Sequence, residues 1–204
     1  MREPKIAASV TITRNGPYIV AGNVPLQTQT ITANAAGDSE SWAPGDRFPA
    51  RETYALCRCG HSATPPFCDG THAKIGFDGT ETASRAPYLD QAKRFDGPAL
   101  ALTDAEPLCA FARFCDANGK VWSQAARTDD AAVRATFLRQ VDNCPSGRLA
   151  AWDKASAQPA EGLLPASIGL IEDPAEGCSG PIWLRSGIPL ISADGFVYEP
   201  KNGS

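Results

Sequence analysis

The first part of the chain alternates short, β-branched apolar runs with turn-forming residues. Residues 10–13 (VTIT) and 18–26 (YIVAGNVPL) are two such runs, and the Asn-Gly pair between them is a strong hairpin signal. Residues 34–49 are polar and contain glycine and serine, which predicts a loop, whereas residues 54–56 (YAL) predict another strand. We therefore expect a small antiparallel sheet at the beginning of the chain.

The pattern becomes helical in the middle of the chain. After a linker at residues 78–97 that is rich in Gly, Asp and Pro, a short helix is predicted over residues 108–114. Apolar side chains then recur on one face of a longer predicted helix, at Val133, Phe137, Leu138 and Val141. Thr128 or Asp129 is expected to cap this helix, because a side-chain oxygen there can accept hydrogen bonds from free backbone amides. Beyond Trp152 the chain returns to loops and short strands.

One β element occurs twice. Residues 16–26 (GPYIVAGNVPL) and 180–190 (GPIWLRSGIPL) align without a gap and share their Gly-Pro openings and Pro-Leu endings. The first copy leads to a strand and a group of cysteines, whereas the second leads to FVYEP at residues 196–200, with neither cysteine nor histidine after it. Two explanations stay open: the second copy supplies strands that complete the sheet of the first, or a longer version of the chain carries a second site.

Length and composition indicate a folded protein without nucleic-acid partners. The 204 residues are 43% hydrophobic and 21% charged, which is ordinary for a globular protein. The net charge is -4 and the basic residues are scattered, so the chain has no basic surface for nucleic acid. No stretch approaches the roughly 18 apolar residues that a membrane span requires, and the beginning of the chain does not resemble a secretory leader. We therefore expect a cytoplasmic protein that does not bind membranes.

The candidate chemistry is concentrated in CRCGHSATPPFCDGTH, residues 57–72. This segment holds three of the seven cysteines and both histidines. Since the cysteine number is odd and the chain is too long to depend on disulfides, metal ligation is the better explanation. Thiolates together with imidazole suit zinc or an iron–sulfur cluster, but structural zinc sites usually separate their first cysteines by two to four residues, and here one residue separates them. A turn and a short helix after Cys68 would bring His72 to the same face.

This segment resembles the CDGSH iron–sulfur family. Every fixed position of the family signature is matched, by Cys57, Cys59, Ser62, Pro66, Cys68, Asp69, Gly70, Thr71 and His72. The resemblance covers about residues 10–77 and implies a 2Fe-2S cluster held by three cysteines and one histidine, namely Cys57, Cys59, Cys68 and His72. His61 lies in the variable part of the signature and is not expected to be a ligand. A neutral imidazole ligand would raise the potential above that of all-cysteine plant-type ferredoxins.

The other cysteines form a second candidate set, Cys109, Cys115, Cys144 and Cys178. Residues 108–152 resemble the divergent mono-cluster 4Fe-4S ferredoxin family in the cysteine spacing, in a Val-Trp pair and in a helix that ends in QVDNCPSG. The middle cysteine position of a single-cluster ferredoxin is occupied here by Ala112. The set can therefore hold a 3Fe-4S cluster with one empty corner, or a 4Fe-4S cluster completed by Cys178, or it consists of buried thiols without metal, with or without one disulfide.

No motif for other chemistry is present. The chain lacks a glycine-rich phosphate loop and a Gly-x-Ser-x-Gly elbow, and both histidines lie within the CDGSH-like segment, so no other cysteine has a histidine base nearby in sequence. We expect an iron–sulfur protein that is not an enzyme and that acts in electron transfer or in cluster storage or transfer. Its partners would be a redox protein or an apo-protein that receives the cluster. The alternative is a zinc-stabilised interaction module without a redox role.

These observations predict an α+β fold in three parts. Residues 1–78 form a small β-rich CDGSH-type 2Fe-2S domain, and residues 79–178 form a linker and a helical ferredoxin-like domain. Residues 179–204 form a returning C-terminal β segment, which repeats residues 16–26 without cluster ligands. Because the β element is repeated, we expect a monomer with internal pseudo-symmetry or a homodimer.

Overall fold

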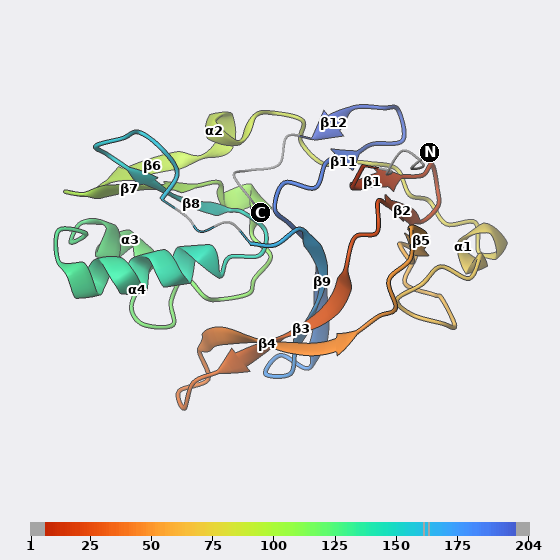
Figure 1. The fold of residues 1–204 in the computed structure, drawn as a ribbon, viewed down its shortest axis with the longest axis horizontal. Coiled ribbons are helices and arrows are strands. Elements are labelled where there is room, and N and C mark those ends of the chain that lie inside the picture. Colours follow the sequence, from red (N-terminus) through yellow and green to blue (C-terminus); the bar gives the residue numbers. More distant parts are fainter. Residues whose placement is uncertain (1–6, 161, 163, 199–204) are drawn as a thin grey trace, which may run out of the picture.

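The computed structural model describes residues 7–160, 162 and 164–198. Within these residues the chain forms twelve strands in three sheets, together with four α-helices and one 3-10 helix, which confirms the α+β class (Figure 1). None of the helices in this part of the chain has the length and apolar character needed to cross a bilayer. The predicted division of the chain near residues 78 and 178 stays a prediction.

The first sheet combines strands from both ends of the chain. Its order is β12-β11-β1-β2-β5, with β1 (Ser9–Ile12), β2 (Tyr18–Ala21), β5 (Thr53–Leu56), β11 (Leu190–Ile191) and β12 (Val197–Tyr198). The strands predicted at residues 10–13 and 54–56 are confirmed, as is the hairpin between β1 and β2. The run at residues 18–26 is divided between two sheets, because Gly22 and Asn23 adopt left-handed conformations with φ of 91° and 56°. Residues 199–200 of FVYEP lie outside the described residues.

The second sheet contains a strand that the sequence did not indicate. Its order is β10-β9-β3-β4, with β3 (Leu26–Ala33), β4 (Ser39–Arg47), β9 (Ser167–Asp173) and β10 (Cys178–Arg185). The loop predicted at residues 34–49 is therefore wrong for most of its length. β4 is an edge strand with mostly exposed or half-exposed residues, so its polar composition reflects its position rather than an absence of structure.

The repeated β element has a structural counterpart. If β1, β2, β3 and β4 are matched with β9, β10, β11 and β12, the order β12-β11-β1-β2 in the first sheet becomes β4-β3-β9-β10 in the second. The parallel registers match as well, since Leu190 faces Val10 and the equivalent Leu26 faces Ile168. The two copies thus exchange strands in a pseudo-twofold arrangement. This confirms the first explanation of the repeat, in which the second copy completes the sheet of the first.

One hydrophobic core lies under both sheets of this pseudo-twofold arrangement. Its buried members come from the two copies and from β5, and they are Val10, Val20, Val24, Leu26, Tyr54, Leu56, Ile168 and Ile188. Because the same cluster contains residues near both ends of the chain, the CDGSH-like segment and the C-terminal β segment are stabilised together.

The third sheet belongs to the ferredoxin-like part. It consists of β6 (Lys93–Asp96), β7 (Leu100–Asp104) and β8 (Leu149–Asp153), and α3 (Val121–Ala125) and α4 (Ala131–Asp142) cover it. The predicted long helix is confirmed as α4, on which Phe137 and Val141 are fully buried. Its cap is Asp130 rather than Thr128 or Asp129, because the Asp130 carboxylate accepts hydrogen bonds from the first free amides. The predicted linker also contains α2 (Tyr88–Gln91) and β6.

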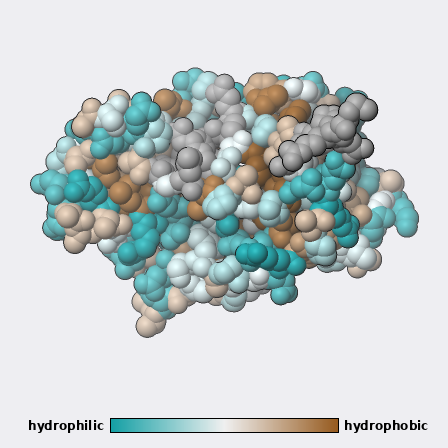
Figure 2. Space-filling model, viewed as in Figure 1, coloured by the Kyte–Doolittle hydropathy of each residue, from teal (hydrophilic) through white to brown (hydrophobic). Residues whose placement is uncertain are grey.

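The helices of the two candidate segments lie at opposite ends of the molecule. In Figure 1, α1 (Thr71–Lys74), which follows the CDGSH-like cysteines, lies at one end, and α3 and α4 lie at the other, with strands of the pseudo-twofold sheets between them. The face shown in Figure 2 is mostly hydrophilic, with hydrophobic residues in small separate areas. The fold therefore separates α1 from α3 and α4.

Candidate metal centres

The first candidate centre begins where β5 ends. The Cys57 amide donates a hydrogen bond to the Pro66 carbonyl at 2.8 Å, and the Cys68 amide donates to the Ala55 carbonyl at 2.9 Å. A bridge between Leu56 and the residue before Cys68 lies between these two bonds. The chain therefore returns antiparallel to β5, and this brings Cys68 back to the end of β5 that leads into Cys57.

The four predicted ligands form two close pairs. The sulfur atoms of Cys57 and Cys59 lie 3.7 Å apart, and Cys68 Sγ lies 3.3 Å from His72 Nδ1. The second pair depends on the predicted turn and short helix, which are confirmed: Gly70 has φ of 87°, and α1 starts directly after it. Among the described residues, no three Cys, His, Asp or Glu side chains converge on a single ion-sized site. All four predicted ligands are partly exposed.

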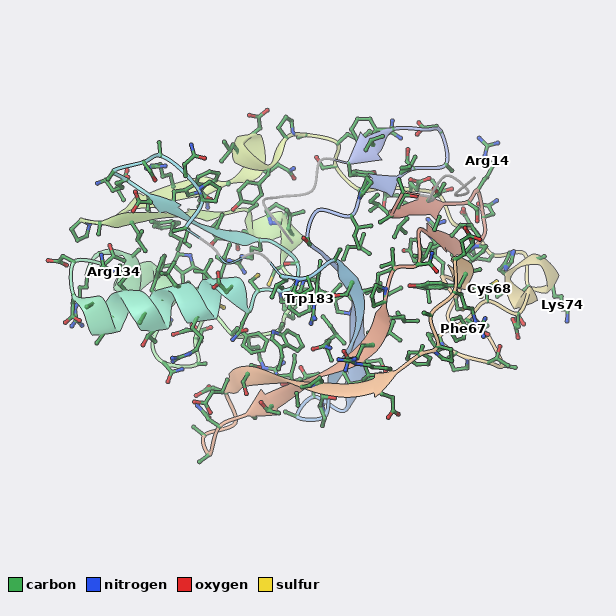
Figure 3. All side chains as sticks on the ribbon, viewed as in Figure 1. Arg14, Phe67, Cys68, Lys74, Arg134 and Trp183 are labelled. Carbon is green, nitrogen blue, oxygen red and sulfur yellow. The ribbon has the colours of Figure 1, made fainter. Side chains whose placement is uncertain are left out.

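The other signature residues shape the loop around these pairs. Asp69 accepts hydrogen bonds from the Ala63 amide at 2.8 Å and from the Thr71 amide at 2.9 Å, and these bonds, with the Ala63 bond first, lower the pKa of Asp69 to about 2. The Ser62 hydroxyl donates to the carbonyl of Phe67 at 2.6 Å, which fixes the residue before Cys68. Figure 3 shows Phe67 and Cys68 at the same end of the molecule as Lys74. These side chains therefore hold the loop in shape through local hydrogen bonds.

The first ligand pair is surrounded by amide donors. Burial is the largest single effect on the Cys57 thiol and acts to raise its pKa. Hydrogen bonds from the Ser62 amide, the Cys59 thiol and the amides of Gly60 and Cys59 together outweigh burial, so the pKa of Cys57 is lowered. Backbone amides that stabilise a thiolate suit a residue that binds a metal or a cluster. His61 is exposed and its Nδ1 lies 2.6 Å from the Cys59 carbonyl.

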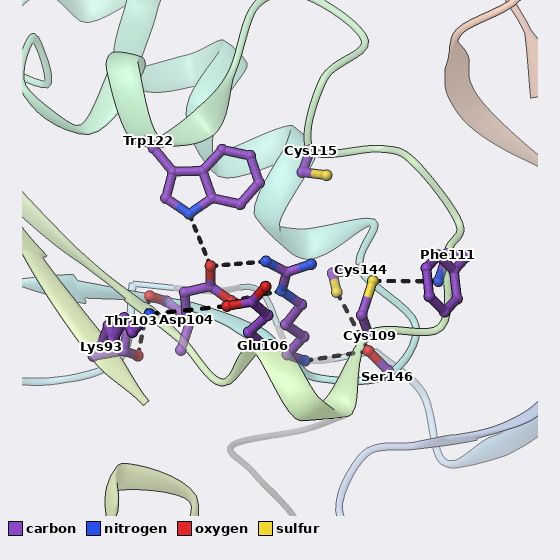
Figure 4. Close-up of polar contacts among 12 residues, drawn as sticks. Lys93, Thr103, Asp104, Glu106, Cys109, Phe111, Cys115, Trp122, Cys144 and Ser146 are labelled. Carbon is purple, nitrogen blue, oxygen red and sulfur yellow. Dashed lines mark hydrogen bonds and ion pairs between the residues drawn. The ribbon is translucent and has the colours of Figure 1, made fainter. Parts of the chain in front are cut away.

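The structure brings together three of the four cysteines in the second set. Cys109, Cys115 and Cys144 line one small pocket, and Figure 4 shows the three side chains in one region. Cys178 is exposed and lines a separate cleft beside this pocket. Ala112 also lines the three-cysteine pocket, at the position where a single-cluster ferredoxin has its middle cysteine.

A loop rather than a helix forms the wall of this pocket. The helix predicted over residues 108–114 is wrong, because a 3-10 helix ends at Leu108 and is followed by irregular chain. Phe111 and Arg113 then adopt left-handed conformations with φ of 56° and 61°, which a helix cannot accommodate. The loop bends so that the Phe111 amide donates to Cys109 Sγ at 3.4 Å. Its residues 110–114 all line the pocket.

A buried ion pair supports the pocket and was not foreseen from the sequence. Arg148 donates to the two oxygens of Asp104 at 2.6 and 2.9 Å, and the indole nitrogen of Trp122 donates to the same carboxylate at 2.9 Å (Figure 4). Burial acts to raise the pKa of Asp104, but these hydrogen bonds outweigh it and lower the pKa. Hydrogen bonds with Asp104 and then Cys109 raise the pKa of Arg148. Arg148, the basic residue of the NCPSGRL segment, was the sequence feature that could have indicated this ion pair.

Burial in the second site disfavours the thiolate form of Cys115. Burial, followed by the nearby Asp116 carboxylate, raises the pKa of Cys115 to about 12. A metal or cluster that binds this sulfur must therefore displace a proton, as is usual for thiolate ligands. Three thiols around one pocket, with an amide donor and a nearby guanidinium, fit the requirements of an iron–sulfur cluster.

Two family models match separate parts of the chain. Residues 15–73 match the family described as iron-binding zinc finger CDGSH type, and residues 95–154 match the family described as divergent 4Fe-4S mono-cluster. No curated protein matches the chain. The two matches confirm both resemblances drawn from the sequence, and they support iron–sulfur cluster binding. The chain is therefore an iron–sulfur protein that joins a segment of the CDGSH type to a segment of the divergent 4Fe-4S mono-cluster type.

Proposed function

We propose that this protein holds a 2Fe-2S cluster on Cys57, Cys59, Cys68 and His72 and acts in electron transfer or in the storage and transfer of clusters. The observation that supports the ligand set is its division into two close pairs, at 3.7 and 3.3 Å. In a 2Fe-2S cluster each iron takes two protein ligands, whereas a structural zinc ion gathers four ligands around one centre. Two separate pairs favour the cluster over the zinc alternative.

The position of these ligands suits exchange with another protein. All four side chains are partly exposed, so a cluster bound to them would lie close to the surface. When bound, the cluster would supply a one-electron redox centre. The residues of the chain hold it, and the amides around Cys57 stabilise thiolate charge. The expected partner is a redox protein or an apo-protein that receives the cluster, and the protein itself would not be an enzyme. We place this function in the cytoplasm, where cysteines are kept reduced.

We also propose a second cluster on Cys109, Cys115 and Cys144. These three cysteines share one pocket, and Ala112 lines the same pocket at the position of the missing ligand. Cys178 lines a different cleft. Three thiolates and an empty corner favour a 3Fe-4S cluster over a 4Fe-4S cluster with Cys178 as its fourth ligand.

Metal and sulfide analysis of protein purified without oxygen tests both clusters. We expect about five irons and about six sulfides per chain, from one 2Fe-2S and one 3Fe-4S cluster. Cys59→Ala should lose about two of these irons and Cys144→Ala about three. Cys178→Ala is the matched control and should lose none. Zinc without sulfide would contradict the redox proposal. A loss of iron in Cys178→Ala would show that Cys178 is a ligand of the second cluster, against the proposal of a three-cysteine site.

Electron transfer and cluster transfer are separated by a second experiment. The 2Fe-2S cluster is followed by absorption while the protein is reduced and reoxidised, and separately while it is mixed with an apo-ferredoxin. Reversible cycles without iron loss would support electron transfer. Appearance of the ferredoxin spectrum at a rate that an iron chelator does not change would support cluster transfer. A cluster that neither cycles nor moves to the recipient would contradict both functions.

A further inference from the structure

An arginine in the CDGSH loop binds the hairpin of its own half of the molecule. Arg58 lies between the two cysteines of the first ligand pair. Its guanidinium donates to the carbonyl of Thr13 at 3.4 Å and to the carbonyl of Gly79 at 2.6 Å, and it lies 5.7 Å from the centre of the Tyr18 ring. Thr13 and Tyr18 belong to the β1–β2 hairpin. The first cluster-binding loop is thus attached to the turn of this hairpin by a cation.

A second arginine has the same relation to the other half. Arg113 lies in the loop between Cys109 and Cys115, and its guanidinium donates to both oxygens of Asp173, at 2.9 and 3.2 Å. It also lies 3.4 Å from the Glu176 carboxylate. The side chain of Asp173 is 7% exposed and that of Arg113 is 31% exposed, so the pair is partly shielded from water. The hydrogen bonds with Asp173 raise the pKa of Arg113.

The two hairpins are equivalent in the pseudo-twofold arrangement. Gly16 of the first hairpin packs so closely on Thr13 that a Cβ atom would collide with the Thr13 hydroxyl. Gly180 occupies the same place in the repeat, and a Cβ atom on it would lie 2.7 Å from the side chain of Ile171. The β9–β10 hairpin is longer than β1–β2, and its additional residues include Asp173 and Glu176. The extension therefore supplies the acids that bind Arg113.

The second cluster-binding loop also packs against this hairpin. Residues 110–113 and the β9–β10 hairpin line a shared cleft of about 300 Å³. Beside it, the Phe114 ring lies 4.8 Å from that of Trp42, which lies 5.0 Å from Trp183 of β10. The ion pair therefore lies at the edge of an apolar contact between the loop and the sheet.

We propose that Arg113 is a positioning residue for the second cluster. It attaches the loop between Cys109 and Cys115 to the β9–β10 hairpin, as Arg58 attaches the CDGSH loop to the β1–β2 hairpin. The pseudo-twofold sheets then act as one scaffold for two different clusters, one on each half. This inference rests on the proposed second cluster.

The two arginines provide matched variants for a test. In Arg113→Ala, the second cluster should be lost to an iron chelator about tenfold faster than in wild type, since charge-assisted bidentate hydrogen bonds are among the stronger polar contacts. The 2Fe-2S spectrum of the same sample should not change. Arg58→Ala should show the reverse selectivity. The double variant Arg113→Asp, Asp173→Arg exchanges the two charges and should restore the slower loss of the second cluster to the chelator. A general structural defect would not be repaired by this exchange.

Thiol alkylation of the cluster-free full-length protein tests the attachment of the loop by Arg113 independently of cluster binding. With iodoacetamide as the probe, Arg113→Ala should alkylate at Cys109 and Cys115 faster than wild type, while Cys57 and Cys59 react at the wild-type rate. Wild type with only about two irons would overturn the second cluster and its positioning together. Wild type with about five irons, but equal chelator loss in Arg113→Ala, would overturn the role of Arg113 and leave the proposed clusters intact.

Discussion

The residues that support the second pocket are charged and buried, and they come from different strands. Asp104 ends β7 and Arg148 precedes β8, so their ion pair connects two strands of the third sheet beside Cys109. Their side chains are 8% and 14% exposed. Compared with apolar packing, a buried pair of this kind adds little to the free energy of unfolding when it is intact. Removal of one partner is costly, because the remaining charge stays buried without a counter-ion and without contact with water. At this scale the pocket depends on residues that are not ligands.

Removal of Arg148 should therefore destabilise the protein strongly. We expect Arg148→Met to lower the free energy of unfolding by about 3 kcal/mol, because the Asp104 carboxylate stays buried without its cation. Urea denaturation followed by tryptophan fluorescence measures the change. Arg94→Met is the matched control, since the Arg94–Asp96 pair is 51% and 59% exposed, and its loss should cost less than about 1 kcal/mol. Equal effects of the two variants would contradict this account.

At the scale of elements, the sequence predicted structure well where side chains alternate or recur on one face. β1, β5 and α4 were found in this way, because each has a buried side with regular spacing. β4 was missed because an exposed edge strand has no apolar side. The helix at residues 108–114 was wrong because left-handed backbone at Phe111 and Arg113 depends on the contacts of the loop, not on local propensity.

The candidate sites show the same limit. The predicted CDGSH ligands come from a dense local motif, and the structure places them in two pairs. In the second set, Cys109, Cys115 and Cys144 were grouped by a sparser motif, whereas Cys178 lies outside that motif, and the structure places Cys178 in a separate cleft. Asp104 carried no signal at all, since its role depends on contact with Arg148, which is distant in sequence. Long-range pairing of this kind is decided by tertiary packing rather than by local pattern.

The equivalent glycines of the two hairpins allow a test at this scale. Gly16→Ala and Gly180→Ala should each lower the free energy of unfolding by about 1–3 kcal/mol, because the added Cβ has no room beside Thr13 or Ile171. Each variant should also release the cluster of its own half faster, as followed by absorption in the presence of a chelator. The control is Ser179→Ala, an exposed position on the same hairpin that should change stability by less than about 0.5 kcal/mol. Loss of the same cluster in both glycine variants would contradict the assignment of one cluster to each half.

At the scale of the whole molecule, the pseudo-twofold arrangement is complete within one chain. β11 pairs in parallel with β1, and β9 pairs in parallel with β3, so each sheet takes strands from both copies. The core residues under these sheets come from both copies too. A second chain is therefore not needed to bury the apolar faces of the two sheets.

The arrangement predicts a monomer, provided that the open sheet edge at β10 does not pair with another chain. Its counterpart β2 is covered by β5, whereas among the residues that the structure describes β10 is the last strand of its sheet. Pro181 lacks an amide donor, and the register shifts between Ser179 and Ile182, and both features interrupt the edge that another strand would need. Light scattering on the cluster-loaded protein, after size-exclusion chromatography at several concentrations, should give a mass near 21.5 kDa. A mass near twice this value at low micromolar concentration would mean that the irregular edge does not prevent association, and that the repeat within the chain does not replace a second subunit.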